Sequence, residues 1–213
     1  MSTAAPLPRY EAMAAAGELT TDVHQIEVAT ELTRVHHAMV PWVKKRREGS
    51  VWGRKDRPRG CYVYGGVGTG KTMLMDMLRD SCESEGVRVE RSHFNSFMLQ
   101  IHSDLHELRG SALEDPLSAV ADGLSRRLDL LCFDEFQVTD VGDAMVMMRL
   151  FSALWDRGVV LVATSNRPVM DLYKNGLQRA AFEPFLHRLS RECVVLRCGT
   201  TVDFRLMGER AGH

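Results

Sequence analysis

The sequence has no long hydrophobic run and no excess of one charge. Its longest uncharged apolar stretches, such as residues 159–163, are far shorter than the roughly 20 residues that a membrane-spanning helix needs. The 27 Lys and Arg residues nearly balance the 28 Asp and Glu residues, which gives a formal net charge of -1. We therefore expect no transmembrane segment, and the chain as a whole has no strong electrostatic attraction to nucleic acid or anionic membranes.

The cysteines show no pairing pattern. The five cysteines are an odd number, and none forms a Cys-x-x-Cys pair. This pattern predicts reduced thiols and no zinc site, with Cys61 and Cys132 as small buried residues of apolar strands. The first 19 residues lack both the apolar core of a secretory signal and the acid-poor, Arg-rich character of a transit peptide, so we expect an untargeted, cytoplasmic protein.

Short apolar runs alternate with helical patterns from residue 61 onward. The apolar runs lie at 61–64, 87–94, 128–133, 159–164 and 193–196, and the helical patterns lie near 71–82, 96–109, 116–126, 140–156 and 168–190. Continuous apolar strands joined by helices predict an α/β fold, in which helices cover both faces of a parallel sheet. We place this three-layer core at residues 60–200, followed by a short tail at 201–213.

Residues 1–59 are expected to form a helical extension and a basic linker. Residues 1–22 are rich in Ala and contain Pro, and we expect them to pack loosely, whereas 23–47 have helical spacing. The stretch 44–59 holds eight Lys or Arg residues and two acidic residues. We interpret it as a solvated connecting loop, with contact to nucleic acid or anionic lipid as the alternative.

A phosphate-binding loop follows the first predicted strand. Its sequence satisfies G-x-x-x-x-G-K-[ST] between a strand and an amphipathic helix, and it consists of Gly65, Gly66, Val67, Gly68, Thr69, Gly70, Lys71 and Thr72. Glycines let backbone N–H groups turn toward phosphates, and the next helix directs its positive N-terminal end at the same anion. We predict that this loop binds ATP, with Lys71 on the β- and γ-phosphates and the Thr72 hydroxyl on Mg²⁺.

Polar residues end two further predicted strands. Asp134 follows the run at 128–133 and is predicted to hold Mg²⁺ from its outer coordination sphere. Glu135 is then placed to orient or deprotonate a water that attacks the γ-phosphate, which means hydrolysis rather than transfer. Asn166 follows the run at 159–164, and we expect it to contact the γ-phosphate or that water at the carboxyl edge of the sheet.

Several of these stretches together resemble the AFG-type, ZapE-like ATPases, which are AAA+ proteins associated with bacterial cell division and mitochondrial protein quality control. The resemblance covers nearly the whole chain and is carried by residues 65–76, 93–98, 132–140, 163–168 and 171–179. It implies an AAA+ type P-loop fold and leaves the mitochondrial matrix as an alternative compartment. It assigns the Walker A, Walker B and sensor roles to Lys71, Thr72, Asp134, Glu135 and Asn166.

The resemblance also implies an active homo-oligomer. Arg179 is similar to the arginine finger by which one subunit completes its neighbour's site, with Arg188 and Arg191 as further candidates and a plain surface arginine as the alternative for Arg179. Gln25 is expected near the adenine. The chain ends at His213, where relatives continue into a helical lid, so the resemblance implies a core whose lid is missing.

These features favour a Mg²⁺-dependent ATPase that remodels a protein partner. One alternative is a nucleotide-binding module with little turnover, and another is a helicase-loader-like accessory that acts on nucleic acid, although nucleic acid is the less expected partner. His102 and His106 have the spacing of a zinc-protease pair but lack its glutamate, so we expect them on an exposed helix face.

Overall fold

The computed structural model describes residues 3–49, 57–110 and 113–199. Its centre is a parallel sheet in the order β2-β3-β4-β1-β5. The strands are β1 (Gly60–Tyr64), β2 (Val89–His93), β3 (Leu130–Asp134), β4 (Val160–Ser165) and β5 (Cys193–Arg197). The predicted parallel sheet is confirmed, and each strand lies where an apolar run predicts one.

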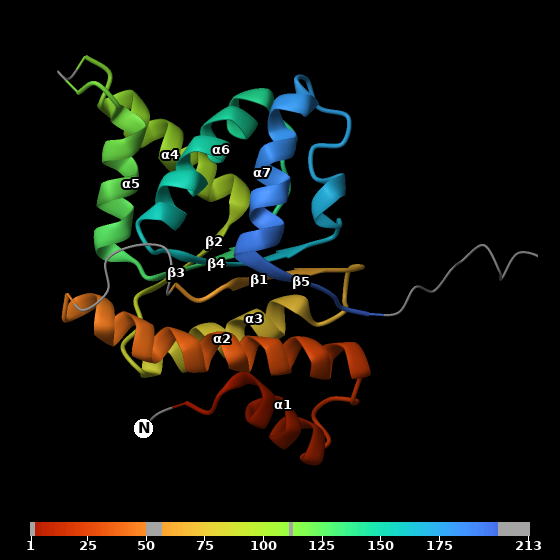
Figure 1. The fold of residues 1–213 in the computed structure, drawn as a ribbon. Coiled ribbons are helices and arrows are strands. Elements are labelled where there is room, and N and C mark those ends of the chain that lie inside the picture. Colours follow the sequence, from red (N-terminus) through yellow and green to blue (C-terminus); the bar gives the residue numbers. More distant parts are fainter. Residues whose placement is uncertain (1–2, 50–56, 111–112, 200–213) are drawn as a thin grey trace, which may run out of the picture.

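Helices cover both faces of this sheet (Figure 1). One face carries α2 and α3, and the other carries α4, α5, α6 and α7. Their bounds are α1 (Pro6–Ala15), α2 (Val23–Arg47), α3 (Lys71–Ser84), α4 (Phe94–Glu107), α5 (Pro116–Arg127), α6 (Val141–Asp156) and α7 (Arg179–Glu192). The predicted three-layer α/β fold is therefore confirmed.

Two apolar clusters lie on either side of the sheet because successive strand residues point to opposite faces. In β3, Phe133 packs in the aromatic-rich cluster under α4 to α7, whereas Cys132 packs in the cluster under α2 and α3. In β1, Tyr62 and Cys61 divide in the same way. Both cysteines are fully buried, as predicted, and burial raises their pKa.

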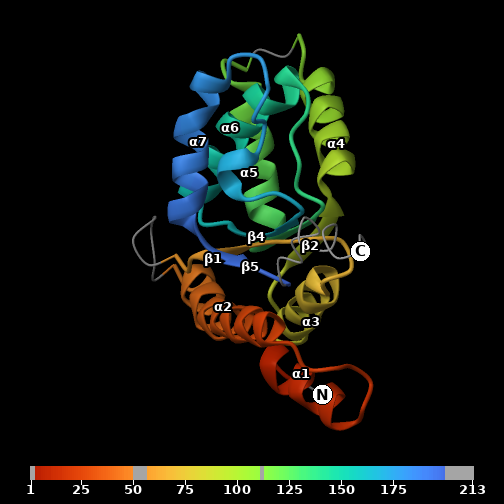
Figure 2. The same ribbon diagram turned by 90° about the vertical axis from the view of Figure 1, so that its right-hand side faces the viewer.

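The prediction that residues 1–22 pack loosely is wrong. Residues 6–15 form α1, which lies against α2 on the side away from the sheet (Figure 2). The ring of Tyr10 is completely buried in the cluster shared with α2 and α3, and Arg9 forms an ion pair with Asp80 of α3 at 2.8 Å. The buried ring of Tyr10, the partly buried Leu7 and Met13, and the Arg9 ion pair together hold this short helix against α2 and α3.

The basic stretch is also more ordered than a solvated loop in its described part. Arg46 and Arg47, at the end of α2, form ion pairs with the buried carboxylate of Asp129. Arg59 donates three hydrogen bonds to backbone carbonyls around the junction of α7 and β5. Residues 50–56, the centre of the stretch, lie outside the described residues. The described arginines therefore bind the protein itself.

The helical pattern near 168–190 divides into a 3₁₀ turn, Val169–Asp171, and α7. Tyr173 and Gln178, between them, have positive φ angles of 57° and 58°, which end helical geometry locally. Within the described residues, no helix has the length and apolarity that crossing a bilayer requires.

Candidate functional site

The predicted phosphate loop connects β1 to α3 at the carboxyl edge of the sheet. Gly68 and Gly70 have φ angles of 77° and 85°, the left-handed region that favours glycine. A Cβ on Gly65 would lie 2.0 Å from the carbonyl oxygen of Cys198, so only glycine fits there. Val67, at the tip, is 88% exposed. The loop thus has the backbone that its glycines predict, and it opens to solvent.

Lys71 is bent back over this loop. Its Nζ donates hydrogen bonds to the carbonyl oxygens of Gly65, at 2.9 Å, and Gly66, at 2.6 Å, and the side chain is buried. Burial lowers the pKa of Lys71, although Cys198 and Asp134 oppose the shift. Phosphate oxygens carry negative charge, so they would attract this buried ammonium more strongly than the neutral carbonyl oxygens do. The loop and its lysine therefore fit a phosphate chain.

Thr72 and Asp134 come together at the start of α3. The Thr72 Oγ1 lies 3.0 Å from Asp134 Oδ1, and the Thr164 hydroxyl donates to the same oxygen at 2.7 Å. The described residues contain no group of three or more His, Cys, Asp or Glu side chains that could hold a metal. One carboxylate and one hydroxyl nevertheless fit Mg²⁺, which commonly binds one or two carboxylates and takes substrate phosphates and waters as its other ligands.

Glu135 and Asn166 follow neighbouring strands at the same edge. Glu135 is exposed and has a φ of 56°, a conformation that is uncommon for residues other than glycine and that clusters at functional sites. Its backbone N–H donates to Thr164 Oγ1 at 3.3 Å, so Thr164 holds both acidic residues. Asn166 is exposed directly after β4. The fold thus brings these predicted residues to the edge where the phosphate loop opens.

The three candidate finger arginines lie at opposite ends of α7. Arg179 starts the helix and donates to the carbonyl of Met170 at 2.8 Å. Since α7 leads into the start of β5, Arg179 lies toward the carboxyl edge of the sheet, whereas Arg188 and Arg191 lie toward the opposite edge. Arg188 is held by an ion pair with Asp156 at 2.7 Å, whereas Arg191 is exposed.

Gln25, on α2, contacts the backbone of the phosphate loop. Its Nε2 donates to the carbonyl of Thr69 at 3.1 Å, and its Oε1 accepts from the Tyr10 hydroxyl at 2.8 Å. The Cys198 thiol donates to the same Thr69 carbonyl at 3.1 Å. Helices α1 and α2 and the end of β5 therefore support the loop. The expected contact of Gln25 with adenine stays a prediction.

Sequence reasoning missed Thr164, Arg91 and Cys198. Arg91 of β2 donates to Asp134 Oδ2 at 3.1 Å. Each of the three contacts a site residue that is distant in sequence, so no local motif identifies it. The signal for Thr164 in the sequence is its place two residues before Asn166, within the stretch 163–168 that carries the family resemblance.

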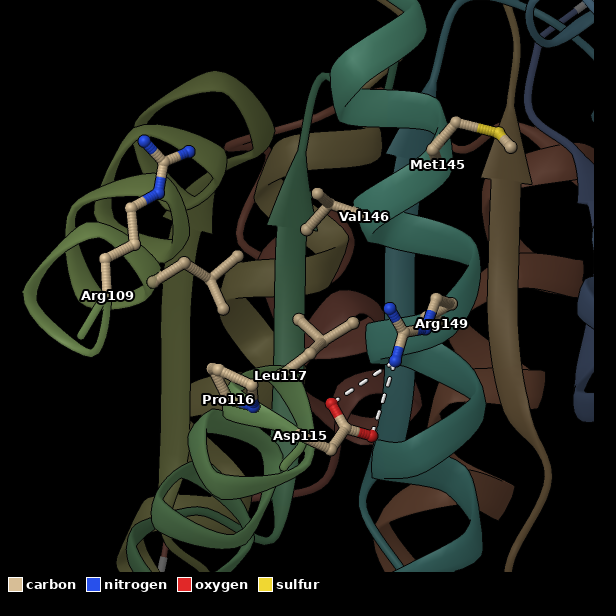
Figure 3. A pocket seen from close by; sticks show the side chains of 8 residues that line it. Arg109, Asp115, Pro116, Leu117, Met145, Val146 and Arg149 are labelled. Carbon is tan, nitrogen blue, oxygen red and sulfur yellow. Dashed lines mark hydrogen bonds and ion pairs between the residues drawn. The ribbon is translucent and has the colours of Figure 1, made fainter. Parts of the chain in front are cut away.

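A separate pocket of about 320 Å³ lies between α4, α5 and α6, on the other face of the sheet from α3 (Figure 3). Leu117 and Val146 line it, and Arg149 binds Asp115 at its rim at 3.2 Å. His102 of α4 is exposed, as predicted, and contacts Asp143 of α6 at 2.7 Å. The pocket is distinct from the phosphate loop.

Comparison with known proteins identifies relatives by sequence. The model of the AFG1-like ATPase family matches residues 4–213. The cell division protein ZapE of Escherichia coli K12 is 44% identical over 172 residues, which cover 78% of this chain and 45% of ZapE. Lactation elevated protein 1 homolog B of Danio rerio is 48% identical over 157 residues, covering 70% of this chain and 31% of that protein. The chain thus spans less than half the length of these relatives.

Solved structures show the same fold at low sequence identity. AMPPCP-bound DnaA from Aquifex aeolicus has a TM-score of 0.59 at 14% identity, covering 89% of this chain and 51% of that chain. The DnaC helicase loader has a TM-score of 0.55 at 12% identity, covering 84% of this chain and 92% of its own. These are P-loop proteins of the AAA+ type, so the predicted AAA+ fold is confirmed. By its sequence, its sheet order and its phosphate loop, the chain belongs to the AFG1-like ATPase family.

Proposed function

We propose that the chain binds ATP with Mg²⁺ and hydrolyses the bond between the β- and γ-phosphates. One observation carries the proposal: Thr72 Oγ1 lies 3.0 Å from Asp134 Oδ1 beside the phosphate loop, and the exposed Glu135 follows directly. A hydroxyl and a carboxylate that can hold Mg²⁺, the carboxylate from the outer coordination sphere, suit water attack on a phosphate when an exposed carboxylate lies beside them. Family membership supports the same reaction.

Each residue then has a defined task. Lys71 leaves the carbonyls of Gly65 and Gly66 and neutralises the phosphates. Thr72 and Asp134 hold Mg²⁺, which supplies positive charge to the phosphate oxygens when it is bound. Glu135 accepts the proton of the attacking water, and Asn166 orients that water or the γ-phosphate. The sheet edge positions all of these groups, because each follows a strand or lies at the start of α3.

An arginine finger from a neighbouring copy completes this proposal, and Arg179 remains the first candidate. Its guanidinium binds its own chain through the Met170 carbonyl, which a neighbour's phosphate would displace as a stronger partner. Fingers of this kind contribute roughly 10³ to 10⁵ in rate. Specific activity is therefore expected to rise with protein concentration and to fall in Arg179→Ala. If Arg191→Ala loses this rise instead, the finger is Arg191.

The partner class is proposed to be protein, in the cytoplasm or the mitochondrial matrix. One similar protein is named for cell division, and this supports a remodelling role there. A nucleic-acid loader is the weaker candidate because Arg46, Arg47 and Arg59 of the basic stretch already bind acceptors of the protein itself. Low-identity likeness to a helicase loader extends to the fold alone.

Glu135→Gln tests the reaction. It removes the proton acceptor and keeps side-chain size, so we expect phosphate release to fall by roughly 10² to 10⁴ while ATP affinity stays unchanged. Glu107→Gln, an exposed glutamate at the end of α4, is the matched control and should keep wild-type turnover. Turnover that persists in Glu135→Gln would remove Glu135 from its role. ATP binding without phosphate release by the wild type, at every protein concentration, would favour the nucleotide-binding module.

A further inference from the structure

An arginine guanidinium contacts the carboxylate that is assigned to Mg²⁺. Arg91 lies in β2, next to β3, and its Nη2 donates to Asp134 Oδ2 at 3.1 Å. The other oxygen of Asp134 accepts from Thr72 and Thr164. Only 9% of the Asp134 side chain is exposed, so water contributes little to its solvation. The guanidinium of Arg91 therefore places a positive charge in direct contact with Asp134, and Lys71 adds a further charge from nearby.

Arg91 also has a second carboxylate within reach. Its Nε lies 2.6 Å from Asp76 Oδ1, in a close ion pair whose angle does not satisfy a directed hydrogen bond. Asp76 is on α3, one turn after Thr72, and is 34% exposed. Arg79 contacts the same Asp76 oxygen at 3.2 Å. The guanidinium of Arg91 thus lies between the metal-ligand candidate and an acidic residue of the phosphate-loop helix.

We propose that Arg91 is a positioning residue that competes with the metal for Asp134. Without metal it neutralises and orients the carboxylate, and when Mg²⁺ arrives it shifts its interaction toward Asp76. The reason is electrostatic: a divalent ion and a guanidinium that share one carboxylate repel each other, and a second anion nearby lets the arginine yield without losing its partner. This inference rests on the proposed function, since it concerns the same metal site.

The proposal predicts how strongly the metal improves nucleotide binding. The measurable quantity is the metal enhancement, defined as the Kd of a fluorescent, non-hydrolysable ATP analogue in EDTA divided by its Kd in excess Mg²⁺. Arg91→Met removes the competing charge, and the enhancement should rise by about ten-fold relative to wild type. Asp76→Asn leaves Arg91 with Asp134 as its main anion, and the enhancement should fall.

Two further variants separate charge from structure. Arg91→Lys keeps the positive charge but loses the planar fork that contacts both Asp134 and Asp76, so its enhancement should lie between those of wild type and Arg91→Met. Arg149→Met makes the same side-chain change at the rim of the distant pocket of Figure 3 and should leave the enhancement unchanged. Circular dichroism of every variant identifies any that does not fold.

The outcomes are distinct. If Arg91 only supports the fold, Arg91→Met changes both Kd values by the same factor, and an unchanged enhancement overturns the proposal. A lowered enhancement in Arg91→Met overturns it as well. If the wild type binds no analogue in either buffer, the proposed function itself fails, and the inference about Arg91 fails with it. A raised enhancement in Arg91→Met together with a lowered one in Asp76→Asn supports competition.

Discussion

Replacing Asp129 by asparagine is expected to destabilise the fold by about 3 kcal/mol. Asp129 precedes β3, is completely buried, and accepts from Arg88 at 2.7 and 2.9 Å, from Arg46 at 3.0 Å and from Arg47 at 3.1 Å. An asparagine amide removes the negative charge and replaces one acceptor oxygen with a donor. Three guanidinium groups from two parts of the chain then lose their common anion.

The size of this loss follows from burial. Removing one partner of a buried ion pair costs about 3–5 kcal/mol. The three arginine side chains are 20%, 48% and 39% exposed, so water partly resolvates them, and the lower end of that range applies. A loss of about 3 kcal/mol in a chain of this length lowers Tm by about 6–12 °C.

Thermal and urea denaturation followed by circular dichroism measure this change. Asp115→Asn is the matched control, because the Asp115 ion pair with Arg149 is exposed and asparagine keeps the N-cap of α5. The control should lose less than about 1 kcal/mol. A loss below about 1 kcal/mol in Asp129→Asn as well would mean that this carboxylate does not hold α2 against the sheet.

Two other predictions concern pH and the metal site. Burial alone raises the pKa of Asp129, but hydrogen bonds and charges from Arg88 and Arg46 outweigh it and lower the pKa. The stabilisation by this charge is therefore fully present above the unfolded pKa of about 3.9 and is lost as the pH falls through the lower folded pKa. The unfolding free energies of wild type and Asp129→Asn, measured in urea, should therefore converge in acid. A difference that stays constant with pH would mean that the charge of Asp129 does not stabilise the fold. Thr164→Val removes the hydroxyl that donates to Asp134, and calorimetry should show a roughly ten- to hundred-fold weaker affinity for ATP with Mg²⁺ but not for ATP in EDTA. Equal losses in both buffers would mean that Thr164 acts on the fold rather than on the metal site.

The core of the fold was predictable because its signals are local. Buried parallel strands read as continuous apolar runs, so Val160–Ser165 and Leu130–Asp134 were located to within about two residues, within the usual error of element ends. The phosphate loop combines a fixed glycine spacing with a strand and a helix, and each part is visible in sequence. Asp134 was predictable because it ends such a strand.

The features that the sequence did not predict depend on contacts between residues that are distant in sequence. Tyr10 helps to hold α1 through its buried ring and a hydroxyl that contacts Gln25, which no periodicity reveals. Arg91 reaches Asp134 only because β2 and β3 are neighbours, and strand order does not follow from the sequence order of the strands. The arginines of the basic stretch were predicted to be solvated because the sequence does not show that Asp129, the partner of Arg46 and Arg47, is buried.

A crystal structure of the Glu135→Gln variant with ATP and Mg²⁺ would show directly whether this loop binds the nucleotide. We expect Lys71 Nζ to leave the carbonyls of Gly65 and Gly66 and to lie about 2.7–2.9 Å from phosphate oxygens, with the metal beside Thr72. A nucleotide bound elsewhere, with Lys71 still on its own loop, would mean that the loop is not the phosphate site.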